Sequence, residues 1–334
     1  MKLVELIKKA RERDLSDASA LQDLFDVCRL YESEHFEESD NRNKEVRRLS
    51  AKNAAERTDM RLVELNKRSL LFDAPYDLDA YLMYLEFNRK PQERFYLPRR
   101  RIMKRVADAM QRLVDGELDE LFLSMPPRVG KTTMLMMFVT WLVGRDSEKS
   151  NLYSAYSDVI TSAFYNGCLE IINDPMTYLW HDVFPAAKVV STNAKDETFN
   201  IDRKKRYPSL TCRSLYGTLN GACDCNGLLL SDDLIGGIEE ALNKDRLVSA
   251  WSKVDNNLLP RAKETAKVLW CGTRWSMVDP AGVRMDLLLN DERFKSRKFE
   301  IINLPALDEQ EHSNFHCLYG VGFSDEYDIQ RRAS

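Results

Sequence analysis

Hydrophobic residues follow a helical period over the N-terminal part of the chain. Across residues 1–70, positions such as Leu3, Ile7 and Leu21 recur at helical spacing in a segment that is dense in charge and contains neither Gly nor Pro. This pattern predicts two or three amphipathic helices. The stretch 32–61 is the most polar, and we interpret it as a solvated helical arm without chemistry of its own.

Beyond residue 70, short apolar runs alternate with segments of helical length. The predicted helices cover residues 80–87, 134–143, 158–173 and 238–256, and a further helix is introduced by residues 95–101 and runs to about residue 114. The predicted strands cover residues 121–124, 151–156, 188–191, 198–201, 209–213, 228–231, 267–273 and 299–304. This alternation predicts an α/β fold with a mostly parallel sheet and helices on both faces. We expect a helical region over 1–70, an α/β domain over 71–305 and a polar, linker-like tail over 306–334.

The most informative segment joins the strand at 121–124 to the helix at 134–143. Two prolines are followed by Gly130, Lys131 and Thr132, which match the end of a Walker A phosphate loop, although Met125 stands where that motif usually has its first glycine. Backbone N–H groups at a helix start attract phosphates. Lys131 would reach the β- and γ-phosphates, and the Thr132 hydroxyl would bind Mg²⁺. The alternative is a chance Gly-Lys-Thr at a helix start.

A second segment ends in paired carboxylates. Apolar residues 228–230 lead to Asp232 and Asp233, the pattern of a Walker B strand. Asp232 would hold Mg²⁺ through water, and Asp233 would orient or deprotonate the attacking water. Alone, such a pair is more often a solvated turn. About a hundred residues after a phosphate loop, it favours a P-loop ATPase, and it argues against a module that binds ATP without turnover.

Composition narrows the possibilities. The chain has 334 residues and a net charge of −4, which excludes a globally basic nucleic-acid binder but leaves local basic patches open. We expect no signal peptide, and the longest apolar run, 134–143, is about half of a membrane span. Seven irregularly spaced cysteines suggest reduced thiols, and Cys223 and Cys225 lack the spacing of a metal site.

Two further clusters have open interpretations. Tyr96, Arg99 and Arg100 precede the phosphate loop and either stack on a purine or form a packed helix start with solvated arginines. The strands at 198–201 and 209–213 form a predicted hairpin around the basic residues 203–206. This tip either contacts a nucleic-acid phosphate or is simply solvated, and solvation is the commoner case.

Taken together, the motifs resemble the large terminase subunits of tailed bacteriophages, the ATPases that drive DNA into proheads. The likeness covers residues 70–305. The segments that carry it are 96–100, 126–133, 214–221, 230–233 and 272–276, and its most specific parts are the Pro-Pro-Arg phosphate loop and the Thr-Arg-Trp strand end.

The resemblance implies a P-loop NTPase with an additional-strand ATPase core, in which the Walker A and Walker B strands lie side by side. ATP and Mg²⁺ would be the cofactors. The loop residues expected to hold ATP are Pro127, Val129, Gly130, Lys131, Thr132 and Thr133. Arg128 would sense or stabilise the γ-phosphate, Thr273 would couple hydrolysis to domain movement, and Tyr96, Arg99 and Arg100 would lie near the adenine.

The resemblance also implies partners. These are double-stranded viral DNA, the portal protein of the prohead, a small terminase subunit and further copies of the chain in a ring, in the host cell cytoplasm and without a membrane. The alternative is a helicase-like nucleic-acid translocase unrelated to capsids.

The sequence departs from the family pattern in three places. Its Walker B end is Asp-Asp where many relatives have Asp-Glu. The loop at Asn220, Gly221 and Ala222 lacks the arginine that many relatives insert into a neighbour's site, and Arg213 is only a weak substitute. Fewer than 30 residues follow Pro305, too few for the nuclease domain of full terminases, so we expect no DNA cleavage by this chain.

Overall fold

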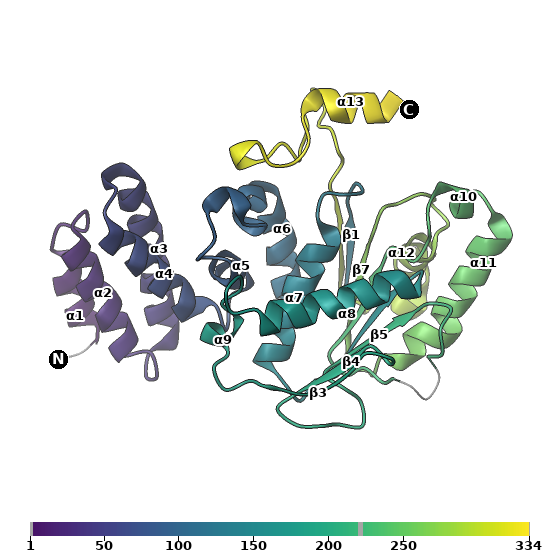
Figure 1. Ribbon diagram of the computed structural model, residues 1–334, viewed down its shortest axis with the longest axis horizontal. Coiled ribbons are helices and arrows are strands. Elements are labelled where there is room, and N and C mark those ends of the chain that lie inside the picture. Colours follow the sequence, from purple (N-terminus) through teal and green to yellow (C-terminus); the bar gives the residue numbers. More distant parts are fainter. Residues whose placement is uncertain (1–2, 220–222, 334) are drawn as a thin grey trace. The chain divides into compact units, whose positions relative to one another are not determined.

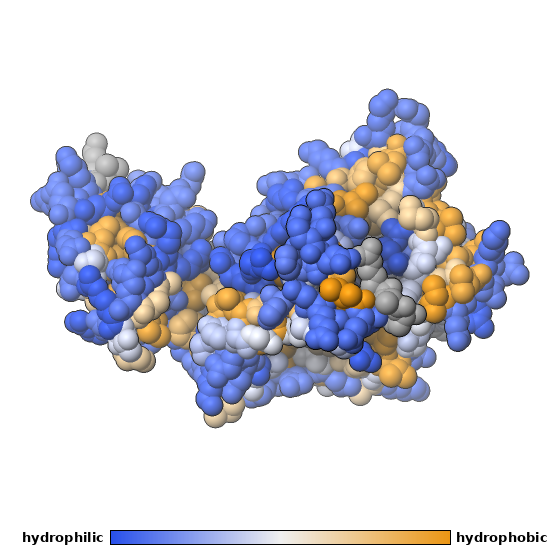
Figure 2. Space-filling view, turned by 90° about the horizontal axis from the view of Figure 1, so that it is seen from above, coloured by the Kyte–Doolittle hydropathy of each residue, from blue (hydrophilic) through white to orange (hydrophobic). Residues whose placement is uncertain are grey.

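The computed structural model describes residues 3–219 and 223–333. The chain divides into two compact units, an N-terminal unit over residues 1–87 and an α/β unit over residues 88–334. The boundary expected near residue 70 falls inside a helix. The surface is mostly hydrophilic with scattered hydrophobic patches, as the 31% content of charged residues leads one to expect (Figure 2).

The N-terminal unit is a set of helices around its own hydrophobic core. The helices are α1 (Leu3–Arg11), α2 (Ala18–Leu30), α3 (Phe36–Arg57), α4 (Met60–Asp73) and α5 (Leu78–Leu85). Asp17, Asp59 and Asp77 accept hydrogen bonds from backbone N–H groups at the starts of α2, α4 and α5, which explains where these helices begin.

The interpretation of 32–61 as a solvated arm is wrong for one face of α3. Asn43 is buried and donates hydrogen bonds to the carbonyl oxygen of Ser69 and to Oδ1 of Asp73, at 2.9 and 2.8 Å. Val46 joins the core formed by α2 and α4. The face is polar and partly paired with groups on α4, so hydrophobicity alone does not reveal that it is buried.

The α/β unit contains one eight-stranded sheet in the order β3-β4-β5-β2-β6-β7-β1-β8. The strands are β1 (Glu120–Ser124), β2 (Asn151–Ala155), β3 (Val189–Asn193), β4 (Thr198–Ile201), β5 (Leu210–Ser214), β6 (Leu228–Asp232), β7 (Lys267–Gly272) and β8 (Phe299–Asn303). Strands from β5 to β8 in this order run parallel, while β4 pairs antiparallel with both β3 and β5. The predicted α/β class and mostly parallel sheet are therefore confirmed.

The expected neighbourhood of the two motif-bearing strands is wrong. β1 and β6 are not side by side, because β7 lies between them and pairs with both in parallel. Leu121 is in register with Leu269, and Leu269 is in register with Leu230. The carboxyl ends of the three strands thus meet at one edge of the sheet.

Helices cover both faces of this sheet (Figure 1). The helices of this unit are α6 (Tyr96–Val114), α7 (Lys131–Arg145), α8 (Asp158–Asn173), α9 (Trp180–Val183), α10 (Ile238–Ala241), α11 (Lys244–Lys253), α12 (Pro280–Asn290) and α13 (Asp325–Ala333), and α13 lies beyond the ends of the strands. α6 packs on β1, and α8 packs on β2 and β5. Phe122, Leu229 and Trp270 face the other way and form a core with Leu247 of α11 and Leu288 of α12.

Two predicted segments differ in detail. The helix expected over 238–256 is broken, because Asn243 caps a new helix by accepting a hydrogen bond from the Arg246 N–H. The tail is more than a linker: Ser313 donates from its hydroxyl to Asp328 of α13 at 2.6 Å, and Phe315 is buried. None of the helices in the described part of the chain combines the length and hydrophobicity needed to span a bilayer.

Candidate active site

A tight loop leads from β1 into α7 at the carboxyl edge of the sheet. Gly130 caps α7 with φ of 97°, and Arg128 has φ of 65°. Gly adopts such backbone angles without a steric penalty, whereas other residues do so at a cost. The glycine at the helix start is therefore required by the path of the backbone. This path turns the chain so that Lys131 and Thr132 lie at the first turn of α7.

Lys131 points back across the loop into the protein. Its Nζ donates hydrogen bonds to the carbonyl oxygens of Met125 and Pro126, at 3.2 and 3.0 Å, and to Oγ1 of Thr273 at 2.9 Å. Only 5% of the side chain is exposed. A buried ammonium group with three acceptors is held in one place. It lies 4.0 Å from Oδ2 of Asp233 at the end of β6.

Asp232 ends β6 in the interior. Its Oδ2 accepts hydrogen bonds from the hydroxyls of Thr132 and Tyr153, both at 3.0 Å. Burial, and secondarily the charge of Asp233, raises the pKa of Asp232 to about 7, against the opposing effects of Thr132, Tyr153 and Lys131. Its Oδ1 is buried and, within residues 3–219 and 223–333, has no hydrogen-bond partner.

Asp233 follows in a strained conformation, with φ of 41°. Its Oδ1 accepts a hydrogen bond from the Thr273 N–H at 2.7 Å, and about a third of its side chain is exposed. A methyl group on Gly272 would lie 3.0 Å from this oxygen, so a larger residue there would crowd the carboxylate. Thr273 thus contacts Lys131 through its hydroxyl and Asp233 through its backbone.

The oxygen atoms of Asp232 and Thr132 suit a divalent cation. The Oδ1 atom of Asp232 has no hydrogen-bond partner among the described residues and could accept a donor or bind a cation, and the Thr132 hydroxyl contacts the same carboxylate. No cluster of three or more acidic, His or Cys side chains able to hold a metal exists among the described residues. A cation here would therefore need further ligands from a bound molecule or water, as Mg²⁺ commonly has.

The aromatic and arginine cluster is arranged differently from the expectation. Tyr96 is fully buried, and the ring that meets the loop belongs to Phe95, since a methyl group on Gly130 would lie 2.4 Å from its Cε2 atom. The Arg99 guanidinium lies 4.8 Å from the centre of the Phe95 ring. Arg100 is half-buried on the same helix. The only sequence signal for Phe95 is an aromatic residue directly before a helix start.

The remaining predicted residues fall into two groups. Pro127 and Thr133 are half-buried in the loop and first turn, Val129 is buried, and Arg128 is exposed without a partner among the described residues. Arg213 lies on β5, where it donates a hydrogen bond to the carbonyl oxygen of Asp196 and is paired with its carboxylate.

The loop at 220–222 lies outside the described residues. Tyr153 was not predicted, since nothing in the apolar run of β2 distinguishes it.

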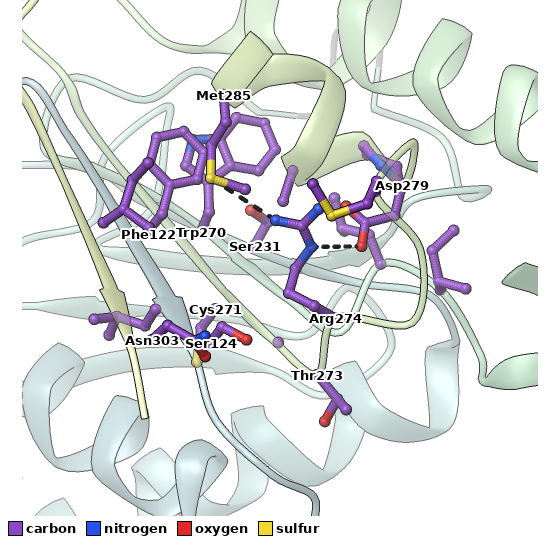
Figure 3. A pocket seen from close by; sticks show the side chains of 18 residues that line it. Phe122, Ser124, Ser231, Trp270, Cys271, Thr273, Arg274, Asp279, Met285 and Asn303 are labelled. Carbon is purple, nitrogen blue, oxygen red and sulfur yellow. Dashed lines mark hydrogen bonds and ion pairs between the residues drawn. The ribbon is translucent and has the colours of Figure 1, made fainter. Parts of the chain in front are cut away.

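Two cavities flank the end of β7. One of about 380 Å³ is lined by the stacked rings of Phe122 and Trp270 and by Arg274, which is bound to Asp279 at 2.8 Å (Figure 3). A larger one of about 760 Å³ is bounded by Pro126 and Pro127 of the loop and by the tail. Thr273 lines both cavities, whereas Lys131, Thr132, Asp232 and Asp233 line neither.

We expect Gly130→Ala to destabilise the loop for two separable reasons. The residue would carry a side chain at φ of 97°, and its methyl group would collide with the Phe95 ring. Thermal unfolding should show a loss of about 1–3 kcal/mol. Adding Phe95→Leu should recover only the part due to the collision. A single Gly130→Ala variant as stable as the wild type would contradict the described loop geometry.

Neither the models of known protein families nor the curated proteins contain a match to this chain.

Proposed function

We propose that this chain is an Mg²⁺-dependent ATP hydrolase with a P-loop NTPase core. The observation that supports it most is the meeting of four side chains from separate segments: Lys131 and Thr132 at the start of α7, and Asp232 and Asp233 at the end of β6. A cation, a hydroxyl, a buried carboxylate and a more exposed carboxylate are the groups that phosphoryl transfer from a nucleotide requires. The strand β7 lies between the two strands that lead to these side chains, which differs from the side-by-side arrangement that the resemblance implies.

The side chains divide the chemistry among themselves. Lys131 would exchange its loop carbonyl partners for the β- and γ-phosphate oxygens, and the N–H groups around Gly130 would hold the same phosphates. Thr132 and Asp232 would hold Mg²⁺, which supplies neutralisation of phosphate charge when bound. Asp233 would accept the proton of the water that attacks the γ-phosphorus, while ADP leaves with the electrons of the broken P–O bond. Thr273 would keep Lys131 and Asp233 in register.

We further propose that this activity drives viral DNA packaging, as in the large terminase subunits that the sequence resembles. The chain would then work in the host cytoplasm as part of a ring at the portal of a prohead, with a small terminase subunit that selects double-stranded DNA. The support is the sequence motifs together with their meeting at one edge of the sheet. A helicase-like translocase remains the second candidate, and stimulation of ATP turnover by proheads that carry a portal, beyond stimulation by DNA alone, separates the two.

Asp232→Asn tests the cation site with two readouts. ATP hydrolysis should be lost, because the ligand charge is removed. The unliganded protein should nevertheless become more stable by about 1–3 kcal/mol at pH 8, because the native state no longer carries a buried ionised carboxylate. The gain in stability is limited because the new amide N–H lacks a hydrogen-bond partner at the position of Oδ1.

The pH dependence of this gain follows from the sign of the shift. The folded-state pKa of Asp232 lies above the ordinary value of 3.8, so ionisation costs stability as pH rises from about 4 to about 7. The stabilisation by Asp232→Asn should therefore vanish near pH 4. Chemical denaturation at both pH values measures it, and Asp224→Asn, at a partly exposed carboxylate distant from the phosphate loop, is the matched control. Normal hydrolysis by Asp232→Asn would remove the basis for the proposal.

Two arginines, Arg128 and Arg213, are candidates for stabilising the γ-phosphate, and they differ in their surroundings. Arg128 is exposed in the loop, whereas Arg213 is tied to Asp196 and would have to leave it to act on a neighbouring chain. We expect Arg128→Gln to lower turnover by roughly 10³-fold, within the range of arginine contributions to phosphoryl transfer. Arg213→Ala remains the test of action in trans. Mixtures of Lys131→Ala and Arg213→Ala chains should regain activity only if Arg213 serves a neighbour.

A further inference from the structure

The loop between β4 and β5 carries the basic residues 203–206, which the proposed chemistry does not use. One of them is turned inward: Lys205 donates from Nζ to the carbonyl oxygens of Ser147 and Lys149, and its own N–H donates to Oδ1 of Asn200 at 3.2 Å. Burial lowers the pKa of Lys205. This lysine therefore ties the loop to the segment that precedes β2.

Further hydrogen bonds fix both ends of the loop. At its start, the N–H of Asp202 donates to the Lys188 carbonyl oxygen at 2.8 Å, and the Lys188 N–H donates back to Oδ1 of Asp202 at 3.0 Å. At its end, the Ser150 hydroxyl donates to the carbonyl oxygen of Tyr207 at 2.8 Å. A loop held in this way pays little conformational entropy when it binds a partner.

The fixed loop directs its other cations outward. Arg203, Lys204 and Arg206 are exposed, and Lys263, from a distant part of the sequence, lies beside Tyr207 at the end of the loop. The Arg206 guanidinium is 5.3 Å and the Lys263 ammonium 5.9 Å from the centre of the Tyr207 ring, so both cations gather around one aromatic side chain. We call Arg203, Lys204, Arg206 and Lys263 the cationic loop surface.

The carboxylates near this surface are Asp146, Glu148, Asp202 and Asp224, and two of them form ion pairs with its cations. Arg203 pairs with Glu148, with 61% of each side chain exposed, and Lys263 pairs with Asp224 at 3.1 Å. Exposed pairs of this kind contribute little and exchange readily. In the described ranges 3–219 and 223–333, neither Lys204 nor Arg206 has a carboxylate partner. Two of the four cations of the surface are thus without a carboxylate partner among the described residues, on a chain whose net charge is −4.

The surface lies at the opposite edge of the sheet from the candidate active site. β5 and β1 run in the same direction through β2, β6 and β7. The cationic loop precedes the start of β5, whereas the phosphate loop follows the end of β1. A ligand of the cationic loop surface is therefore separate from the nucleotide, and the two can be measured independently.

We propose that the cationic loop surface binds the phosphate backbone of double-stranded DNA. Several preorganised Lys and Arg side chains on one loop match a polymer with regularly repeated negative charges, and each phosphate contact releases condensed counterions. The choice of DNA among polyanions rests on the proposed packaging function. Charged side chains of this kind contact phosphates, and phosphate contacts carry no base information, so the expected binding is independent of base sequence.

The test is the triple variant Lys204→Gln/Arg206→Gln/Lys263→Gln, with DNA binding followed by fluorescence anisotropy on a labelled duplex of about 30 bp without nucleotide. Loss of three phosphate contacts should weaken binding about 10- to 100-fold and reduce the slope of log K against log salt by about 2–3. Lys90→Gln/Lys244→Gln/Lys295→Gln removes the same charge from exposed lysines elsewhere in the α/β unit and should bind as the wild type does.

Each result decides the matter. Equal DNA affinity and salt slope in the triple variant and the wild type would overturn the proposal, as would equal weakening in the control variant. The proposal would also be overturned if the wild type binds poly-glutamate but not DNA and the triple variant loses the binding to poly-glutamate. That result would favour an acidic protein partner. ATP binding, measured in parallel, should be unchanged in the triple variant. A chain that binds DNA through this surface but never hydrolyses ATP would refute the proposed function alone.

Discussion

Lys131→Ala is expected to reduce ATP turnover to the background of the assay, a loss of about 10³-fold or more. The variant removes the only cation that the described structure places among the loop carbonyls, Thr273 and the Asp233 carboxylate. The γ-phosphate would then develop its charge opposite Asp233 without the compensating charge of Lys131. Steady-state phosphate release at saturating Mg-ATP measures the effect.

Loss of Lys131 also leaves the carbonyls of Met125 and Pro126 without their donor, so stability must be followed by thermal unfolding. A few degrees of destabilisation is compatible with the expectation, because the unpaired groups cost about 1–3 kcal/mol. Lys104→Ala is the matched control: it removes an exposed lysine that pairs with Asp108 on α6. If Lys131→Ala folds and hydrolyses ATP like the control, the assignment of the phosphate loop fails.

Asp233→Asn is expected to bind Mg-ATP with nearly wild-type affinity and to lose turnover by about 10²–10⁴-fold, the usual contribution of a general base. The substitution isolates charge well. Asn tolerates the positive φ of this position, and its amide oxygen can still accept the hydrogen bond from the Thr273 N–H. What disappears is the ability to take a proton from water.

Asp233→Glu provides the complementary measurement. It keeps the carboxylate and should retain part of the activity, although Glu tolerates positive φ less well and must find room beside Gly272. Single-turnover hydrolysis separates the chemical step from product release. Full turnover by Asp233→Asn would move the base elsewhere, with Glu239 and Glu240 of α10 the next carboxylates to replace.

The strands β1, β6 and β7 could be predicted from sequence because each is a short apolar run with polar or turn residues at its ends. β2, β4 and β8 agree with the expectation to within one residue at each end. The order of strands could not be predicted in the same way. The insertion of β7 between β1 and β6 depends on long-range pairing, and no local pattern near Lys267 records which neighbours it takes.

The candidate site shows the same division. Lys131, Thr132, Asp232 and Asp233 were predicted from motif and spacing, and the structure brings them together. Tyr153 was not predicted, because the sequence does not distinguish a tyrosine that donates a hydrogen bond to Asp232 from any other aromatic residue in a strand. Whether an aromatic ring beside Gly130 comes from Phe95 or Tyr96 depends on the exact rotation of α6, which sequence patterns define only to within a residue or two.

The position of β7 fixes the spacing between β1 and β6, the two strands that lead to the candidate active site. Two inter-strand steps of about 4.8 Å separate the backbones of β1 and β6. The phosphate loop and the first turn of α7 bring the Thr132 hydroxyl to 3.0 Å from Asp232 and the Lys131 ammonium to 4.0 Å from Asp233, both at the end of β6. A residue of the same charge but a different length, such as Glu in place of Asp232, would change a spacing that the order of the whole sheet determines.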